Sequence, residues 1–315
     1  MTPAGVGPAG SIVTVGTFDG VHCGHRAVLE EIAGRAREAG RSSVLVTFEP
    51  HPLAVVNPAA APPRLTTAHE RLEVLATSEL DRVVQLRFDR AMAAMGPEQF
   101  VDEVLIARCD MRELVIGHDH GFGKGRQGDV TTLQELGAAR GFGVDVVDAV
   151  VAGGGTVSST AIRRAIAGGD LAGAARQLGR AYSVSGTVQH GAGRGRTIGV
   201  PTLNLGAAPD KLLPPDGVYA VIADTPAGRF GGMMNQGHRP TFDDGQRLLE
   251  VHLFGFEGDL YDRSVRVAWV APIRGIRRFA DATALRQQLE QDAVRARAAL
   301  AVAHPDLAAP SGRHE

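Results

Sequence analysis

The stretch Gly16-Thr17-Phe18-Asp19-Gly20-Val21-His22-Cys23-Gly24-His25 decides how the first half of this chain is interpreted. It follows the apolar run 12–15 and precedes a helical pattern that begins near Ala27. A strand, a tight glycine turn and a helix N-terminus together present backbone N–H groups to a phosphate. Two histidines, His22 and His25, stand at that point, and imidazole can donate a hydrogen bond to the charge on a transferring phosphoryl group. We therefore expect the active-site turn of a nucleotide-using enzyme.

Two other interpretations of the histidine pair stay open. His22 and His25 could be ordinary helix-start residues whose rings bond to nearby groups, or they could ligate a metal ion. A metal site needs a third ligand at suitable spacing, and none is evident in the sequence. The phosphate role is favoured because the turn and the helix start supply matching backbone donors.

Length and composition narrow the class of protein. A chain of 315 residues exceeds the roughly 250–300 residues at which single cores stop growing, so we expect two domains. The composition is 44% hydrophobic and 22% charged with a net charge of −2, which fits a globular protein and disfavours a nucleic-acid binder. The only cysteines, Cys23 and Cys109, support neither a disulfide framework nor a thiolate zinc site. With no long apolar run and no signal-peptide pattern, we expect a cytoplasmic protein without a membrane partner.

Short apolar runs alternate with helical patterns along the first half. The runs lie at 12–15, 43–48, 83–86, 113–116 and 144–151. Capping boxes at Thr67–Glu70 and Thr132–Glu135 start two helices, and Pro97 starts another that runs to about Arg108. This alternation predicts a parallel sheet of about five strands with helices on both faces. Ligands of such sheets bind outside the carboxyl ends of the strands.

Two further unusual sequences lie at the carboxyl edge of the predicted sheet. Glu49-Pro50-His51-Pro52 ends the second predicted strand, because two prolines forbid continuation. The Gly-rich segment 117–129 follows the fourth strand, but its spacing is not that of a Walker A loop, and a solvated loop is the favoured interpretation of this segment by itself. Ser158-Ser159-Thr160-Ala161-Ile162-Arg163 opens a later helix. Its hydroxyls could be simple N-caps or, with the arginine one turn on, a phosphate clamp.

The second half is β-rich. Short runs at 184–189, 218–224, 230–235, 248–256 and 265–270 predict a small antiparallel barrel, which a helix over about 282–301 closes. Between the first two runs lies a glycine-rich segment that ends in Pro201-Thr202-Leu203-Asn204. Thr202 and Asn204 share one side of an extended segment, so their oxygens could face a Mg²⁺–nucleotide. A plain turn is the alternative.

Together these segments resemble the bacterial bifunctional riboflavin kinase/FAD synthetase family. That family carries a Gly-x-Phe-Asp-Gly-Val-His-x-Gly-His turn, a Phe-x-Pro-His-Pro turn, a Gly-rich loop and a Ser-Ser-Thr-x-Ile-Arg helix start. The resemblance implies a Rossmann-like FMN adenylyltransferase domain. By it, His22 and His25 are catalytic, Asp119 binds the flavin, and the nucleotide phosphates are bound by Gly16, Phe18, Gly24, Ser159, Thr160 and Arg163.

The resemblance continues through the second half, so that it covers about residues 11–300. Matching segments are Gly195–Asn204, Pro215–Tyr219, Asn235–Phe242, Glu250-Val-His252 and Asp259-Leu-Tyr261. They imply a riboflavin kinase in which Glu250 is the general base. Thr202 and Asn204 would hold Mg²⁺, Gly195 and Arg196 would bind the nucleotide, and Asn235 and Arg274 would bind the flavin. Departures from the family pattern are His120, Gly255, Asp262 and Ile276.

The resulting expectation is an α/β Rossmann-like nucleotidyltransferase domain at 11–182, followed by a small antiparallel β-barrel domain at 183–303 with a C-terminal helix. The chain would phosphorylate riboflavin to FMN and adenylylate FMN to FAD with ATP and Mg²⁺. A paralogue with one activity or a modified flavin, which Gly255 and Ile276 suggest, and a non-catalytic flavin-binding protein are the alternatives. The sequence leaves open whether the chain forms a homo-oligomer.

Overall fold

The computed structural model describes residues 10–117, 128–148, 151–152, 155–190, 200–238 and 247–308. The chain divides into two compact units, Met1–Ala161 and Ile162–Glu315, and each is described by itself. This division falls within helix α8 (Ser159–Ala167). The predicted domain boundary at 182/183 stays a prediction.

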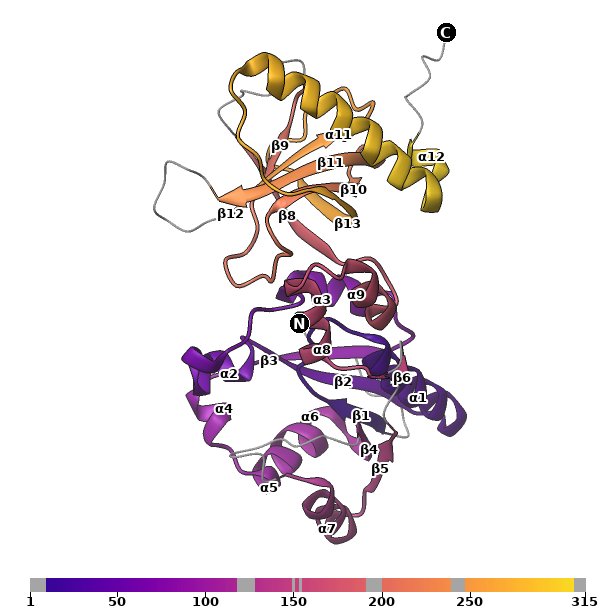
Figure 1. Cartoon of the computed structure of the whole chain (residues 1–315). Helices are drawn as coiled ribbons and strands as arrows, with labels where there is room; N and C mark the ends of the chain where they lie inside the picture. The colour runs from indigo at the N-terminus through magenta and orange to yellow at the C-terminus, as the bar shows by residue number, and fades with distance from the viewer. Residues whose placement is uncertain are drawn as a thin grey trace. The chain divides into compact units, whose positions relative to one another are not determined.

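The first unit is built on a parallel sheet of five strands (Figure 1). In chain order they are β1 (Ser11–Val15), β2 (Ser42–Glu49), β3 (Arg82–Arg87), β4 (Met111–Gly117) and β5 (Gly143–Val147). Their spatial order is β3-β2-β1-β4-β5, with Val13 paired to Val44 on one side and to Leu114 on the other. The order reverses direction between β1 and β4, which is where doubly wound sheets bind ligands.

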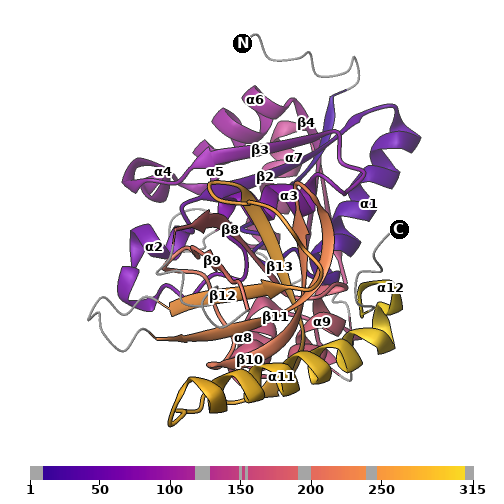
Figure 2. The ribbon, with the colours of Figure 1, turned by 90° about the horizontal axis from the view of Figure 1, so that it is seen from above.

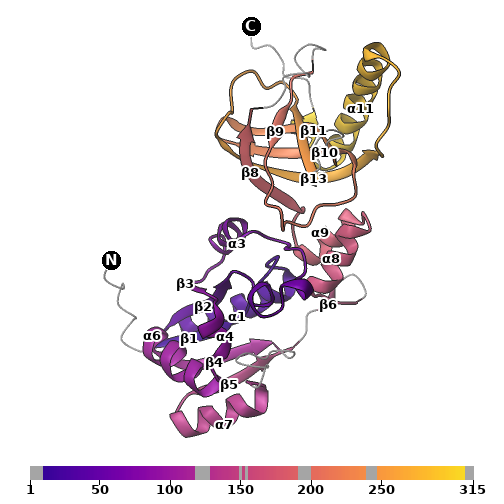
Figure 3. The same cartoon turned by 90° about the vertical axis from the view of Figure 1, so that its left-hand side faces the viewer.

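Helices cover both faces of this sheet because strand side chains alternate between the faces. On one face, Val13 and Val15 pack with Phe100, Val104 and Leu133 of the helical segments after β3 and β4. On the other face, Ile12 packs with Leu29 and Ile32 of α1 (Cys23–Ala39) and with Leu75 of α3 (Ala68–Leu75). Figure 3 shows α1 and α7 (Val130–Arg140) on opposite sides of the strands. The predicted α/β layer architecture is confirmed.

The remaining elements of the first unit are short. They are α2 (Pro52–Val56), η1 (Pro58–Ala60), α4 (Arg90–Ala94), α5 (Pro97–Phe100), η2 (Val101–Ile106), α6 (Ala107–Cys109), β6 (Val151–Ala152) and β7 (Gly155–Thr156). Segments α5, η2 and α6 follow one another without a break, so the predicted helix from Pro97 exists but has π geometry over its middle. The predicted strand 144–151 ends at Val147, and Val151 belongs to the small β6–β7 pair.

The second unit begins with the rest of α8 and α9 (Leu171–Leu178), which precede a closed antiparallel barrel. The barrel strands are β8 (Ser183–Gln189), β9 (Leu203–Leu205), β10 (Gly217–Thr225), β11 (Gly228–His238), β12 (Arg247–Leu253) and β13 (Ser264–Arg274). Their order around the barrel is β10-β11-β12-β9-β8-β13. Five of these match the predicted runs. The short β9 comes from the segment that we expected to be merely extended.

A helix packs on the outer face of the barrel. Helix α11 (Ala282–Ala303) runs along β10 and β11, as Figure 2 shows, and α12 (Pro305–Ala308) follows it. Ala296 and Leu300 of α11 join Ala220, Ile222 and Met233 in one cluster. On β12, the buried Leu249, Val251 and Leu253 alternate with partly exposed residues, so the strand presents a second set of side chains to the outer face. No helix of the described residues is long and apolar enough to cross a membrane.

Candidate active sites

The turn after β1 has unusual backbone geometry. Phe18 and Val21 have φ values of 48° and 38°, in the left-handed region, and the intervening Gly20 has φ 84°. Bulky and β-branched residues rarely adopt this region, and such strain persists only where the surroundings fix it and function uses it. The turn lies beside the point at which the strand order reverses. Both features support the predicted ligand-binding turn.

A buried carboxylate holds this turn in place. Asp19 is 1% exposed and accepts hydrogen bonds from the backbone N–H groups of Leu65 (3.0 Å) and Thr66 (2.9 Å), and from the Thr66 hydroxyl (3.1 Å). That hydroxyl oxygen also accepts from the Gly20 N–H at 3.0 Å. The turn is therefore tied to the loop that precedes α3. We did not predict this role for Asp19, and its only sequence signal is an acidic residue between Phe18 and Gly20.

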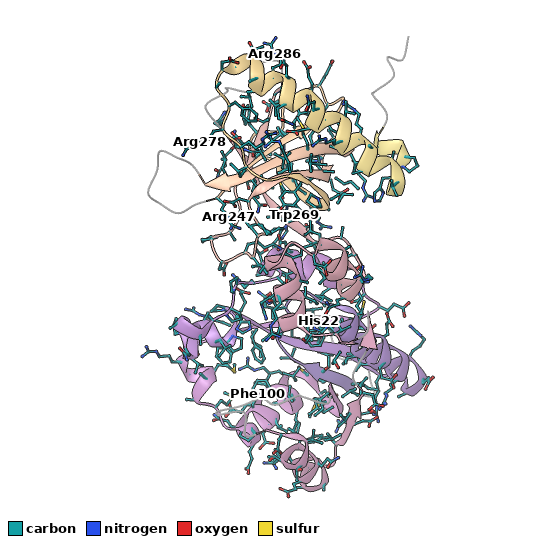
Figure 4. All side chains as sticks on the ribbon, in the orientation of Figure 1. His22, Phe100, Arg247, Trp269, Arg278 and Arg286 are labelled. Carbon is teal, nitrogen blue, oxygen red and sulfur yellow. The ribbon has the colours of Figure 1, made fainter. Side chains whose placement is uncertain are left out.

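His22 and His25 lie at the start of α1, where Figure 4 shows His22. His22 is the N-cap: its Nδ1 accepts from the His25 N–H at 3.2 Å. This bond puts the proton of a neutral His22 ring on Nε2. The two rings stack with centroids 3.6 Å apart, and the Phe18 ring lies 4.5 Å from that of His25. His22 therefore makes the hydrogen bond expected of an ordinary helix-start residue, through Nδ1. This bond orients the ring.

Two glycines of the motif are required by this packing. A Cβ added at Gly24 would lie 3.3 Å from His22 Cε1 and Nδ1, and one at Gly16 would lie 3.0 Å from Phe18 Cε2. Both distances are tighter than ordinary van der Waals contact. The described residues contain no group of three or more His, Cys, Asp or Glu side chains that could hold a metal ion. The metal interpretation of the histidine pair therefore has no support there.

The start of α8 reaches the same turn. Ser158 Oγ accepts from the Ala161 N–H (3.2 Å), so Ser158 is a helix cap. Ser159 Oγ instead donates to the Asp19 carbonyl at 2.9 Å. Thr160 is exposed and Arg163 follows it by three residues, one helical turn along the same face. The cap interpretation is confirmed for Ser158, and the phosphate-clamp role of Ser159, Thr160 and Arg163 stays a prediction.

A charged cluster fixes the Glu-Pro-His-Pro turn at the end of β2. The Glu49 carboxylate accepts from Arg64 Nη1 (2.7 Å) and Arg71 Nη2 (3.1 Å), and Arg71 also donates to the Phe48 carbonyl at 2.9 Å. Burial lowers the pKa of Arg71, and the charges of Glu49 and Asp19 oppose that shift. Sequence reasoning missed Arg71, which is buried. The cluster joins this turn to the loop that binds Asp19.

The strand register of the barrel brings three predicted residues together on its outer face. The register pairs Asn204 of β9 with Glu250 of β12, and Glu250 with Asn235 of β11. Paired residues on neighbouring strands point to the same face, and Asn235 Nδ2 donates to Glu250 Oε2 at 3.3 Å. Thr202 lies two residues before Asn204 and is partly exposed. The predicted base, one predicted metal ligand and one predicted flavin-binding residue therefore form a single row.

Arg274 has a different environment from the one predicted. Its guanidinium donates to the Asp292 carboxylate of α11, with Nε–Oδ2 and Nη2–Oδ2 distances of 2.9 and 2.8 Å. Asp292 is fully buried and also accepts from Gln288, which in turn accepts from Arg277. This network ties residues 274–277 to α11. The charge of Arg274 is thus engaged by Asp292, and its flavin-binding role stays a prediction.

Three of the departures from the family pattern lie among the described residues: Gly255, which has φ 67°, Asp262 and Ile276. Asp262 has φ 59°, a conformation that glycine adopts without cost and aspartate tolerates better than most residues. Its N–H donates to the Val188 carbonyl at 2.9 Å, so the turn is formed with aspartate in place of glycine. Ile276 is 53% exposed, and a Cβ at Gly237 would lie 3.5 Å from its Cδ1. Asp119, Gly195, Arg196 and His120 lie outside the described residues.

Comparison with known proteins covers both halves. The family model of FAD synthetase matches residues 7–161, and that of riboflavin kinase matches residues 178–300. A bifunctional riboflavin kinase/FMN adenylyltransferase of Pseudomonas fluorescens is 40% identical over 96% of this chain and 94% of its own length. The protein of the same description from Escherichia coli K12 is 38% identical over 91% and 92%. This chain belongs to the bifunctional riboflavin kinase/FMN adenylyltransferase family.

A solved structure supports the same fold. A crystal structure described as a macrolide-efflux protein from Streptococcus pneumoniae is 30% identical and superposes with a TM-score of 0.79, covering 90% of this chain and 93% of that one. The similarity covers both the sheet unit and the barrel unit of this chain. The words 'macrolide-efflux protein' describe the pneumococcal protein and are not applied to this chain.

Proposed function

We propose that this chain catalyses both reactions of its family. Its barrel transfers the γ-phosphoryl group of ATP to riboflavin to give FMN, and its sheet domain transfers AMP from ATP to FMN to give FAD and pyrophosphate. The observation that carries the proposal is the row of Asn204, Glu250 and Asn235 on one barrel face, together with the strained histidine turn of the sheet domain.

In the kinase reaction, the Glu250 carboxylate takes the proton of the ribityl 5′-hydroxyl of riboflavin. The resulting oxygen attacks the γ-phosphorus of ATP, and ADP leaves. Glu250 suits a general base because it is partly exposed on the outer barrel face and one of its oxygens is oriented by Asn235 at 3.3 Å. General bases act at hydrogen-bond distance from the proton that they remove.

Mg²⁺ fits the residues at this site. Its protein ligands would be the Thr202 hydroxyl and the Asn204 amide oxygen, since magnesium prefers oxygen donors and takes few protein ligands beside substrate phosphates. When bound there, the ion would neutralise charge on the phosphates of ATP. The pairing of Asn204 with Glu250 supports this assignment, because the two side chains share one barrel face.

In the adenylyl transfer, a phosphate oxygen of FMN attacks the α-phosphorus of ATP, and pyrophosphate leaves. No covalent protein intermediate is needed, because positioning and charge stabilisation supply most of the catalysis. His22 and His25 would donate to phosphate oxygens from the start of α1, while Thr160 and Arg163 at the start of α8 would bind the β- and γ-phosphates. The proposed partners are the small molecules riboflavin, FMN and ATP, in the cytoplasm.

The test is a product assay on the purified full chain. Riboflavin, ATP and Mg²⁺ should yield FMN and then FAD by chromatography, and FMN supplied directly should yield FAD. Formation of neither product would overturn the proposal. Formation of only one would assign a single activity, and turnover of riboflavin analogues in preference to riboflavin would point to a modified flavin at the loop that carries Ile276.

A further inference from the structure

His252 makes a contact that the kinase reaction described above does not use. It lies two residues after Glu250 on β12, and its Nδ1 is 2.8 Å from the carbonyl oxygen of Pro201. A carbonyl oxygen only accepts hydrogen bonds, so Nδ1 must carry the proton and donate it. Both residues belong to the barrel unit, but they are separated by the whole segment that includes β9, β10 and β11.

The His252 ring also makes a contact with a neighbouring aromatic ring. It packs edge-on against the Phe254 ring with centroids 5.8 Å apart. Phe254 in turn belongs to the cluster formed with Ala296 and Leu300 of α11, and the Arg297 guanidinium lies 4.1 Å from its centroid. Burial is the main cause that lowers the pKa of His252, and Arg297 adds to it. The ring is therefore neutral near pH 7.

The Pro201 carbonyl lies where ladder pairing between β9 and β12 stops. The ladder pairs Leu205 with Leu249, Asn204 with Glu250 and Leu203 with Val251, and goes no further toward the N-terminus of β9. Thr202 comes next, outside the strand, and Pro201 follows it outward. The side-chain bond from His252 therefore continues the attachment of this segment past the last ladder pair. Thr202 is therefore flanked by two attachments to β12: the Leu203–Val251 ladder pair and the bond from His252 to Pro201.

We propose that His252 is a positioning residue of the kinase site, which fixes the Thr202 hydroxyl for magnesium–ATP through the Pro201 carbonyl. This inference rests on the proposed riboflavin kinase function. His252 touches neither substrate nor metal. Its contribution is to lower the freedom of a segment that has only three ladder residues to hold it, and loosely held ligands reduce catalysis strongly.

Two variants of the full chain separate this role from simple packing. His252→Ala removes the donor, whereas in His252→Asn the amide Nδ2 takes the place of ring Nδ1 and can still donate to the Pro201 carbonyl. His304→Ala, which changes a histidine after α11, is the matched control. Riboflavin phosphorylation is measured against magnesium–ATP concentration, and FAD formation from FMN by the same chain reports on the intact sheet domain.

The expected result is a rise of about tenfold in the KM for magnesium–ATP in His252→Ala, the size of one lost hydrogen bond. His252→Asn should return to within about threefold of the wild-type value, and FAD formation should not change. Kinase parameters of His252→Ala equal to wild type would overturn the inference. Equal losses in the alanine and asparagine variants would also overturn it, because they would show that the ring is needed for packing.

The tautomer supplies a readout that does not depend on activity. In ¹⁵N-histidine-labelled wild-type protein, His252 should show a protonated Nδ1 and an unprotonated Nε2 at pH 7. The opposite tautomer would overturn the contact on which the inference rests. If the wild type shows the expected tautomer but makes no FMN, the kinase function itself has failed and the positioning role fails with it, while the contact stands.

Discussion

The His25 ring contacts two other rings, with centroids 3.6 Å from His22 and 4.5 Å from Phe18. We expect His25→Ala to abolish FAD formation, because it removes an imidazole from the proposed phosphate-binding turn and the ring contacts that this imidazole makes. FMN formation should remain within about twofold of wild type, since the barrel has its own core. Both products are measured in one chromatographic assay. FAD formation that persists in the variant would remove His25 from the catalytic group.

Glu250 offers the complementary test in the barrel. Glu250→Gln keeps the size of the side chain and a partner for Asn235, but it removes the proton acceptor. Phosphorylation of riboflavin should fall by about 10²–10⁴-fold, the usual contribution of a general base. FAD formation from supplied FMN is the control and should be unaffected. Near-normal phosphorylation would revive the non-catalytic interpretation of this barrel face.

The residue types of both sites could be predicted, but their supporting contacts could not. His22, His25 and Glu250 carry chemistry that the sequence displays. Asp19 and His252 act instead through backbone groups of Thr66 and Pro201. Every residue has a backbone N–H or carbonyl, so no pattern of side chains distinguishes the ones that are used. Only the folded arrangement brings them within reach.

At the scale of elements, the sequence predicts some helix starts correctly and others wrongly. Thr67 forms the predicted capping box with Glu70. The next predicted box, Thr132 with Glu135, is wrong, because the helix begins earlier and Asp129 accepts from the Thr132 N–H at 2.9 Å. Both registers satisfy the local rules for a cap. In the structure the helix takes the earlier start, so that Val130, Thr131 and Thr132 form its first turn.

Helix α11 depends on a cap of its own. Asp281 accepts from the Ala284 N–H at 2.8 Å, and the helix then carries Ala296 and Leu300 onto the barrel. We expect Asp281→Ala to lower the free energy of unfolding of the barrel by about 1 kcal/mol, while Asp281→Asn, which still caps, should cost less than half of that. Urea titration of the full chain, followed by Trp269 fluorescence, measures both. Equal losses in the two variants would mean that the charge, and not the cap, matters.

At the scale of the whole molecule, the sheet was easier to predict than the barrel. Strands and helices that alternate along the chain leave few topologies, and the right-handed crossover rule restricts them further. The barrel closes through β9, a strand of three residues that is too short to show a period. Asn204 and Asn235 are brought to Glu250 by strand register. Their row could therefore be expected from the family resemblance, whereas the spacing of these residues along the chain does not indicate it.

Stability of the barrel should also depend on pH through His252. Burial and Arg297 hold its folded pKa below the ordinary 6.5, so the unfolded chain binds a proton first as the pH falls. The free energy of unfolding should therefore decrease as pH drops below about 6.5 and level off below the folded pKa. Urea titrations from about pH 7.5 to about pH 5 test this on wild type and His252→Asn. The difference between the two should change with pH in that window, and a constant difference would contradict the assignment.

The hydrogen bond from Ser159 to the Asp19 carbonyl has a consequence for the order of synthesis. All five sheet strands have left the ribosome once Val147 has emerged, so the sheet can pair while the chain is still growing. The turn after β1 then waits for a hydroxyl encoded 140 residues downstream. A nascent chain released just before Ser159 would carry a complete sheet and an unfinished nucleotide turn, and adenylyl transfer would be the last property that the first unit acquires.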